Sequence, residues 1–139
     1  MRAQLNAWSV RPLPHVPAGL MTNAARSIFV FGIYLVCTGL ILVAAPNILL
    51  ALLRLAPTTE PWIRVLGILV GVMGAFHIAA ARGDVIPFFR FTVWGRGIVL
   101  IGLASLVLLK LAPPVLIVFG LVDAAGAVWT RAALRNGAA

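Results

Sequence analysis

WIRVLGILVGVMGAFHIAAA, residues 62–81, is the stretch that decides the fold. It holds a single charged residue, Arg64, close to its start. At about 1.5 Å per residue, a helix of this length crosses the roughly 30 Å hydrocarbon core of a bilayer. The stretch therefore predicts a membrane-spanning helix, around which the other predicted helices are arranged.

Small residues line one face of this predicted helix. Gly67, Gly71 and Gly74 follow one another at intervals of four and three residues, which places them on the same side of an α-helix. Helices in lipid associate through close van der Waals packing, and glycine allows two backbones to approach. We expect these glycines to receive a neighbouring helix.

The composition of the whole chain indicates lipid as its solvent. The chain has 139 residues, of which 63% are hydrophobic, and its mean hydropathy is +1.10. Soluble domains are usually about half apolar. The lipid bilayer is therefore the expected partner. The net charge of +8 does not predict nucleic-acid binding, because the basic residues lie at the ends of apolar runs and form no basic stripe.

The apolar runs predict an all-α polytopic membrane protein, an antiparallel bundle of four transmembrane helices with short interfacial helices. Residues 27–131 form its transmembrane domain, with spans at about 27–45, 62–81, 93–111 and 114–129. The short apolar run at 47–57 and the aromatic segment at 87–91 are expected to lie at the membrane interface. Residues 1–26 and 132–139 are expected to be cytoplasmic tails, the first of them flexible.

The distribution of basic residues predicts the orientation of the bundle. Most of them fall in the two tails and the loop between the second and third spans. These are Arg2, Arg11, Arg26, Arg82, Arg90, Arg96, Arg131 and Arg135, whereas the opposite side has Arg54, Arg64 and Lys110. The positive-inside rule then places both termini in the cytoplasm, in a cell inner membrane. Translation from Met1 and from Met21 are both compatible with the sequence.

Asp123 is the polar residue that stands out, because it lies near the middle of the fourth span. A charged residue at that depth costs roughly 2.5–3.5 kcal/mol on insertion scales, so we expect it to face the bundle interior. Gly120 lies on or beside the same helix face and leaves room for another helix. The candidate partners of Asp123 are His77 and Arg96, with Arg64 ranked third. A structural ion pair is the first interpretation, while a proton relay and ligand recognition are the alternatives.

No catalytic or metal-binding set is visible in the sequence. The two histidines are His15 and His77, no cysteine cluster exists, and no pair of carboxylates lies within the membrane. A metal site would lack ligands, so we predict no metal and no cofactor. Cys37, the single cysteine, is expected to be a small buried hydrophobic residue. Neither membrane serine belongs to a nucleophile motif, and we assign no catalytic residue.

The chain resembles small four-helix bacterial membrane proteins of the DoxX-like kind. The resemblance rests on WIRVLG at 62–67, GRG at 95–97 and GLVD at 120–123. It implies quinone-coupled sulfur oxidation or an accessory role in a larger assembly, and it identifies no catalytic residue. Small multidrug resistance transporters, a rival of similar size, depend on a glutamate in the first span, and residues 27–45 contain no acid.

These observations favour a non-enzymatic integral membrane protein that acts as a subunit or scaffold of an inner-membrane assembly. It would be a homo-oligomer or part of a larger membrane complex. Two alternatives stay open. The first is a small proton- or ion-coupled transporter that uses Asp123, and the second is the membrane subunit of a quinone-linked oxidoreductase.

Overall fold

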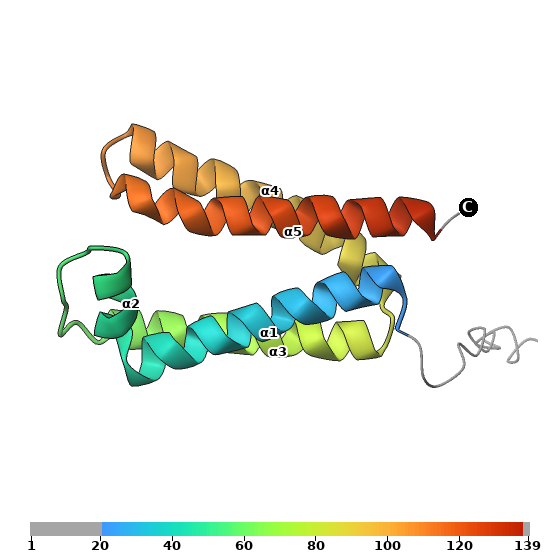
Figure 1. Cartoon of the computed structure of the whole chain (residues 1–139), viewed down its shortest axis with the longest axis horizontal. Helices are drawn as coiled ribbons and strands as arrows, with labels where there is room; N and C mark the ends of the chain where they lie inside the picture. The colour runs from blue at the N-terminus through green and yellow to red at the C-terminus, as the bar shows by residue number, and fades with distance from the viewer. Residues whose placement is uncertain (1–20, 138–139) are drawn as a thin grey trace, which may run out of the picture.

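The computed structural model describes residues 21–137, and within that range every regular element is helical (Figure 1). The elements are α1 (Asn23–Ala44), α2 (Pro46–Leu52), α3 (Trp62–Arg82), α4 (Ile86–Leu108), the short 3₁₀ helix η1 (Pro114–Leu116) and α5 (Ile117–Asn136). Four helical segments are long and apolar enough to cross a membrane, namely α1, α3, α4 and the run from η1 through α5. The predicted all-α fold with four candidate spans is confirmed, and the chain is a multi-pass integral membrane protein.

Three of the helices end in the same way. Arg54, Asp84 and Lys110 follow α2, α3 and α4 and have positive φ angles of 57°, 46° and 59°. After each of these residues the chain turns back. The backbone N–H of the next residue donates a hydrogen bond to a carbonyl oxygen five residues earlier, as Val85 N does to the oxygen of Ala80 at 3.0 Å. This pattern is the Schellman motif, which satisfies carbonyl groups that the helix leaves unpaired.

The first helix pair, α1 and α3, packs backbone against backbone. A Cβ atom on Gly39 of α1 would lie 2.6 Å from the Gly67 carbonyl oxygen, and one on Gly74 would lie 2.7 Å from the Val36 nitrogen. Gly71 behaves differently, because a Cβ atom there would meet nothing within 4 Å. Gly67 and Gly74 therefore face α1, while the side-chain direction of Gly71 points into open space.

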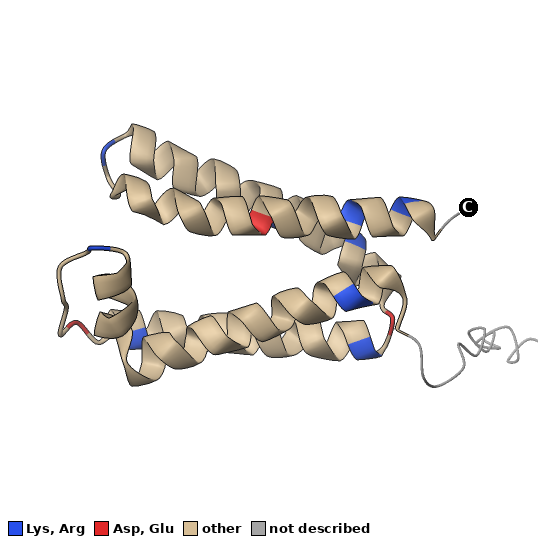
Figure 2. Cartoon of the chain, in the orientation of Figure 1, with Lys and Arg blue, Asp and Glu red and all other residues tan. Residues whose placement is uncertain are grey.

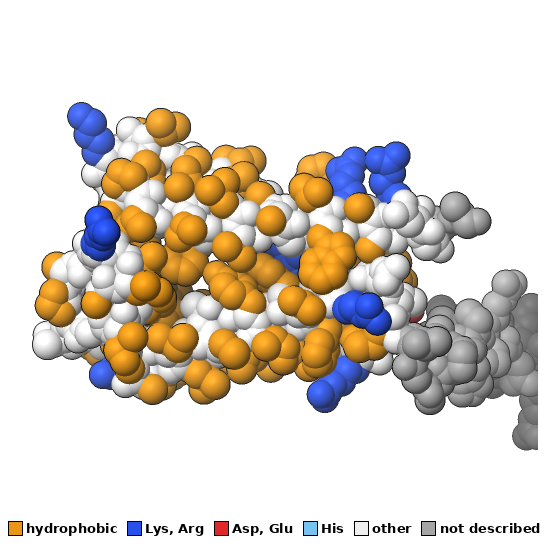
Figure 3. All heavy atoms as spheres, viewed as in Figure 1, with side chains coloured by type: hydrophobic (Ala, Val, Ile, Leu, Met, Phe, Trp, Pro, Cys, Tyr) orange, Lys and Arg blue, Asp and Glu red, His pale blue; other side chains and the backbone are white. Residues whose placement is uncertain are grey.

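The second pair consists of α4 and α5, joined by the short turn that contains Lys110. Gly120 of α5 lies against α4, since a Cβ atom there would be 3.0 Å from Leu100 Cδ1. The two pairs meet at the end where α1 begins, and they diverge toward the other end (Figure 1). In the space-filling view a hollow separates the pairs along this divergent part (Figure 3).

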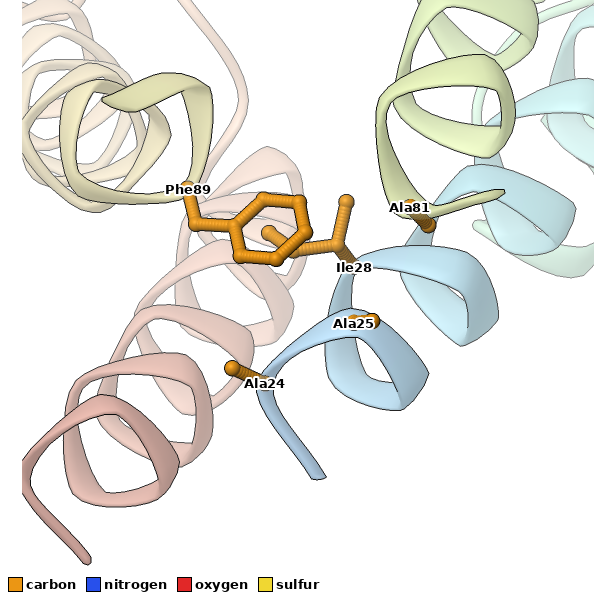
Figure 4. Packing of buried hydrophobic residues seen from close by; sticks show 5 residues of the cluster. All are labelled: Ala24, Ala25, Ile28, Ala81 and Phe89. Carbon is orange, nitrogen blue, oxygen red and sulfur yellow. The ribbon is translucent and has the colours of Figure 1, made fainter. Parts of the chain in front are cut away.

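A small apolar cluster closes the convergent end. It contains Ala24, Ala25, Ile28, Ala81 and Phe89, and the ring of Phe89 points toward Ile28 (Figure 4). Because α1, α3 and α4 each contribute to it, the cluster connects the two helix pairs.

Helices α1, α4 and α5 each extend beyond one end of the span predicted from hydropathy, although α4 ends at Leu108, before the predicted 111. Helix α4 begins at Ile86, so the aromatic segment at 87–91 forms its first turns. Pro87 suits that first turn, and burial of Phe89 fixes it. Helix α1 begins at Asn23 and α5 continues to Asn136, so part of each predicted tail is helical. Residues 1–20 and 138–139 lie outside the described range.

The expectation that Cys37 is buried is wrong, because the structure places it on the exposed surface of α1. In a membrane span such a surface faces lipid or a partner helix. A small, weakly polar side chain is compatible with either neighbour.

Exchanging single glycines tests the packing of α1 against α3. Gly39→Ala is expected to destabilise the protein by about 1–3 kcal/mol, because the new methyl group overlaps the backbone of α3. Gly71→Ala is the matched control. It is expected to leave stability unchanged or to raise it by up to about 1 kcal/mol, since its methyl group enters open space in a helix. Reversible unfolding in mixed detergent micelles measures the free energy of unfolding of both variants. Equal changes in the two variants would contradict this packing.

Candidate functional site

The most deeply buried charge of the described residues is Arg96 in α4, which is 3% exposed. The plane of its guanidinium lies over Phe31 of α1, with Cζ 3.7 Å from the ring centroid. Its Nη1 donates a hydrogen bond to Thr130 Oγ1 of α5 at 3.3 Å. Gly126 makes room for it, because a Cβ atom there would lie 2.8 Å from Nη1. Arg96 therefore occupies the point where α1, α4 and α5 meet.

Two hydroxyl groups extend this contact. The side-chain oxygens of Ser27 in α1 and Thr130 in α5 are 3.0 Å apart. Thr130 Oγ1 also lies 2.9 Å from the carbonyl oxygen of Gly126, and Ser27 Oγ lies 2.7 Å from that of Ala24. Because each hydroxyl has one proton, one of them donates to its carbonyl and the other donates to its partner hydroxyl. Both side chains are buried. A polar contact of this kind between spans is stabilising because lipid offers no alternative partner.

Arg96 does not use all of its donors. Its Nε and Nη2 atoms are buried, and no hydrogen-bond partner for them lies within residues 21–137. A buried cation with unpaired donors is costly, and this cost falls when an opposite charge is near. Asp123 is placed to supply that opposite charge, because it lies one helical turn before Gly126, the residue that Arg96 Nη1 approaches. The one side-chain hydrogen bond that Arg96 makes within the described residues nevertheless goes to Thr130 and not to Asp123.

Asp123 lies close to the middle of α5 and is partly exposed. It precedes Gly126 by about one helical turn, so it lies on the α5 face that receives Arg96. The structure thus brings Asp123 and Arg96 into one neighbourhood.

His77 of α3 belongs to the same region but has its own partners. It is 5% exposed, and its Nδ1 atom lies 2.8 Å from the carbonyl oxygen of Met73. Its ring packs against Phe31 at 5.5 Å between centroids and edge-on against Phe88 at 5.1 Å. Phe31 is therefore the common neighbour of His77 and Arg96. The hydrogen bond to its own helix backbone fits a structural histidine.

Arg64 is not part of this cluster. It lies at the opposite end of the bundle, where Nη1 donates to the carbonyl oxygens of Val43 and Ala44 at the end of α1. The carboxyl end of a helix carries partial negative charge, so a cation there is stabilising. Arg64 acts as a cap for α1.

Sequence reasoning missed three members of the cluster, namely Ser27, Phe31 and Thr130. Thr130 carried a signal, because it follows Asp123 and Gly126 at the helical spacing that places all three on one face. Phe31 carried none, since an aromatic residue in an apolar run is ordinary. Its contact with Arg96 depends on how the two helix pairs meet.

This arrangement can hold a fixed positive charge beside an acid within the membrane. The described residues contain no group of three or more side chains suited to a metal ion. Neither cluster hydroxyl is hydrogen-bonded to the imidazole of His77, which bonds Met73, so the site lacks an activated nucleophile. The site suits binding, charge compensation or proton transfer better than covalent catalysis.

The fold and the site define a small helical membrane protein with four candidate spans and an arginine buried where the helix pairs meet. Comparison of the chain with protein-family models, curated protein sequences and solved structures gives no match.

Proposed function

We propose that the chain is a non-enzymatic scaffold subunit of an inner-membrane assembly and that it pairs with a second copy through α4. The uncovered face of α4 carries this proposal. Cβ atoms added to Gly95 or Gly102, which are seven residues apart and therefore on one face of α4, would each meet nothing within 4 Å. Only 11% of the apolar window of α4 is buried, as in the span through α5, against 33% for α1. A relation to DoxX-like proteins, and with it a place beside a quinone-linked oxidoreductase, stays a prediction from the sequence resemblance.

Glycine in a helix interior lowers helix stability, and close approach of another backbone offsets that cost. In α1 and α3 this approach takes place within the chain, where Gly39, Gly67 and Gly74 are covered. The glycine positions of α4 lack such a neighbour. A second copy would cover this face with the same face of its own α4, because two-fold symmetric pairs are the commonest assemblies.

Gly102→Leu tests the pairing. The added side chain is expected to hold two α4 helices apart and to weaken self-association at least tenfold, which corresponds to about 1.4 kcal/mol. Ile101→Leu, an exposed position about 100° around α4 from Gly102, is the control and should associate like the parent protein. Single-molecule photobleaching in lipid vesicles measures the monomer–dimer equilibrium. A parent chain that stays monomeric, or a Gly102→Leu variant that pairs normally, would contradict the proposal.

The second candidate function is a small proton- or ion-coupled transporter. One observation favours it, the placement of the partly exposed Asp123 near the buried and incompletely paired Arg96. Protonation of the carboxylate would remove its attraction for Arg96 and change the balance of forces between the helix pairs. Intramembrane acids of this kind serve as proton relays in pumps and transporters.

Flux measurements in reconstituted vesicles distinguish the two candidates. For a transporter, Asp123→Asn should reduce pH-driven flux at least tenfold, because the amide cannot exchange a proton. Glu60→Gln in the loop before α3 is the control and should leave flux unchanged. Flux that is absent in the parent chain, or equal in the parent and Asp123→Asn proteins, would exclude transport through this acid.

A further inference from the structure

A cavity of about 370 Å³ lies at the end of the bundle where α1 begins, away from Arg96. Three parts of the chain surround it: the start of α1, the α3–α4 turn with the first turns of α4, and the end of α5. Its polar lining residues include Asn23, Asp84, Arg90 and Asn136. The cavity therefore combines charged groups of both signs in one place.

One side of the cavity can bind an anion. Arg90 is exposed there, and its side chain makes no hydrogen bond with the described residues. Asn23 and Ala24 form the first positions of α1, where backbone N–H groups have no partner within the helix. The cap residue Thr22 accepts from Ala25 N at 3.0 Å, so it does not occupy these two amides. A phosphate group suits this combination of guanidinium and amide donors.

The other side can bind a cation. Asp84 accepts the hydroxyl of Thr22 through Oδ1 at 2.9 Å, and its second carboxylate oxygen makes no hydrogen bond within residues 21–137. The end of α5 lies beside it, where the last carbonyl groups give the helix terminus partial negative charge. A small ammonium group with several N–H donors fits a carboxylate and carbonyl oxygens together.

The position of the cavity suggests where such a ligand comes from. It lies at a helix end, and the basic residues Arg26, Arg82, Arg131 and Arg135 lie at the same end of the bundle (Figure 2). Phospholipid head groups are concentrated at this level of a membrane. Ala24, Ile86 and Leu134 add an apolar wall that suits the glycerol and upper acyl carbons.

We propose that this cavity binds the head group of a phospholipid that carries both a phosphate and a primary ammonium, as in phosphatidylethanolamine. The phosphate contacts Arg90 and the start of α1, and the ammonium contacts Asp84 and the end of α5. A choline head group fits less well, because its methyl groups donate no N–H bonds and none of the residues that line the cavity is aromatic. The proposal does not depend on self-association or transport.

The test uses the purified full chain in detergent and three short-chain phospholipids, with ethanolamine, choline or glycerol head groups. Their apparent affinities are measured by titration of thermal stability, and retained lipid is counted by native mass spectrometry. The ethanolamine lipid is expected to bind at least tenfold more tightly than the choline lipid. Arg90→Gln should weaken ethanolamine and glycerol lipids alike, because both carry the phosphate.

Asp84→Asn isolates the contribution of the carboxylate charge. Asparagine can still accept the hydroxyl of Thr22, and it tolerates the positive φ of 46° at this position. The variant should therefore keep its fold and lose the preference for ethanolamine over choline. Arg131→Gln, at the same end but outside the cavity, is the control and should bind like the parent protein.

Two outcomes would overturn the proposal. Equal affinity for all three lipids would show that the cavity does not select a head group. Tightest binding of the glycerol lipid, with no effect of Asp84→Asn, would show an anion site without an ammonium site.

Discussion

A guanidinium inside an apolar bundle constrains how this protein is built. Arg96 is almost completely buried, so its charge has to be balanced by groups that other helices bring to it. Phe31 supplies a ring face, Thr130 a hydroxyl oxygen and Asp123 an opposite charge. These groups come from α1 and α5, which fixes the level at which the two helix pairs meet.

The helices are held together by two different physical means. Within the pair α1–α3 the contact is apolar and depends on glycines that let the backbones touch. Between the pairs the contact combines the small apolar cluster around Ile28 with the hydroxyl and guanidinium groups near Thr130. Because this second contact lies at one end, the pairs diverge elsewhere and leave the hollow of Figure 3. The same convergence encloses the cavity beside Asp84.

Much of the fold could be predicted from the sequence, because hydropathy and helix length identify the four spans directly. Gly67 and Gly74 face α1, but helical spacing alone did not reveal that a side chain at Gly71 would point into open space. It also did not reveal that Gly67 meets Gly39 while Gly74 meets Gly32 and Val36. Charged residues such as Arg90 and Arg131 led to spans that were too short, since a helix can continue while such side chains point outward. The neighbours of Arg96 depend on the contact between pairs, which no local pattern encodes.

Disulfide formation between α1 and α5 tests the meeting of the helix pairs most directly. Ser27 and Thr130 have side-chain oxygens 3.0 Å apart, a spacing compatible with a disulfide between cysteines at these positions. In a Cys37→Ser background, Ser27→Cys with Thr130→Cys should cross-link rapidly in native membranes under mild oxidation. Ser27→Cys with Ser105→Cys, whose second position lies toward the far end of α4, should not. Failure of the first pair to cross-link, or equal reaction of both, would contradict the junction at Arg96.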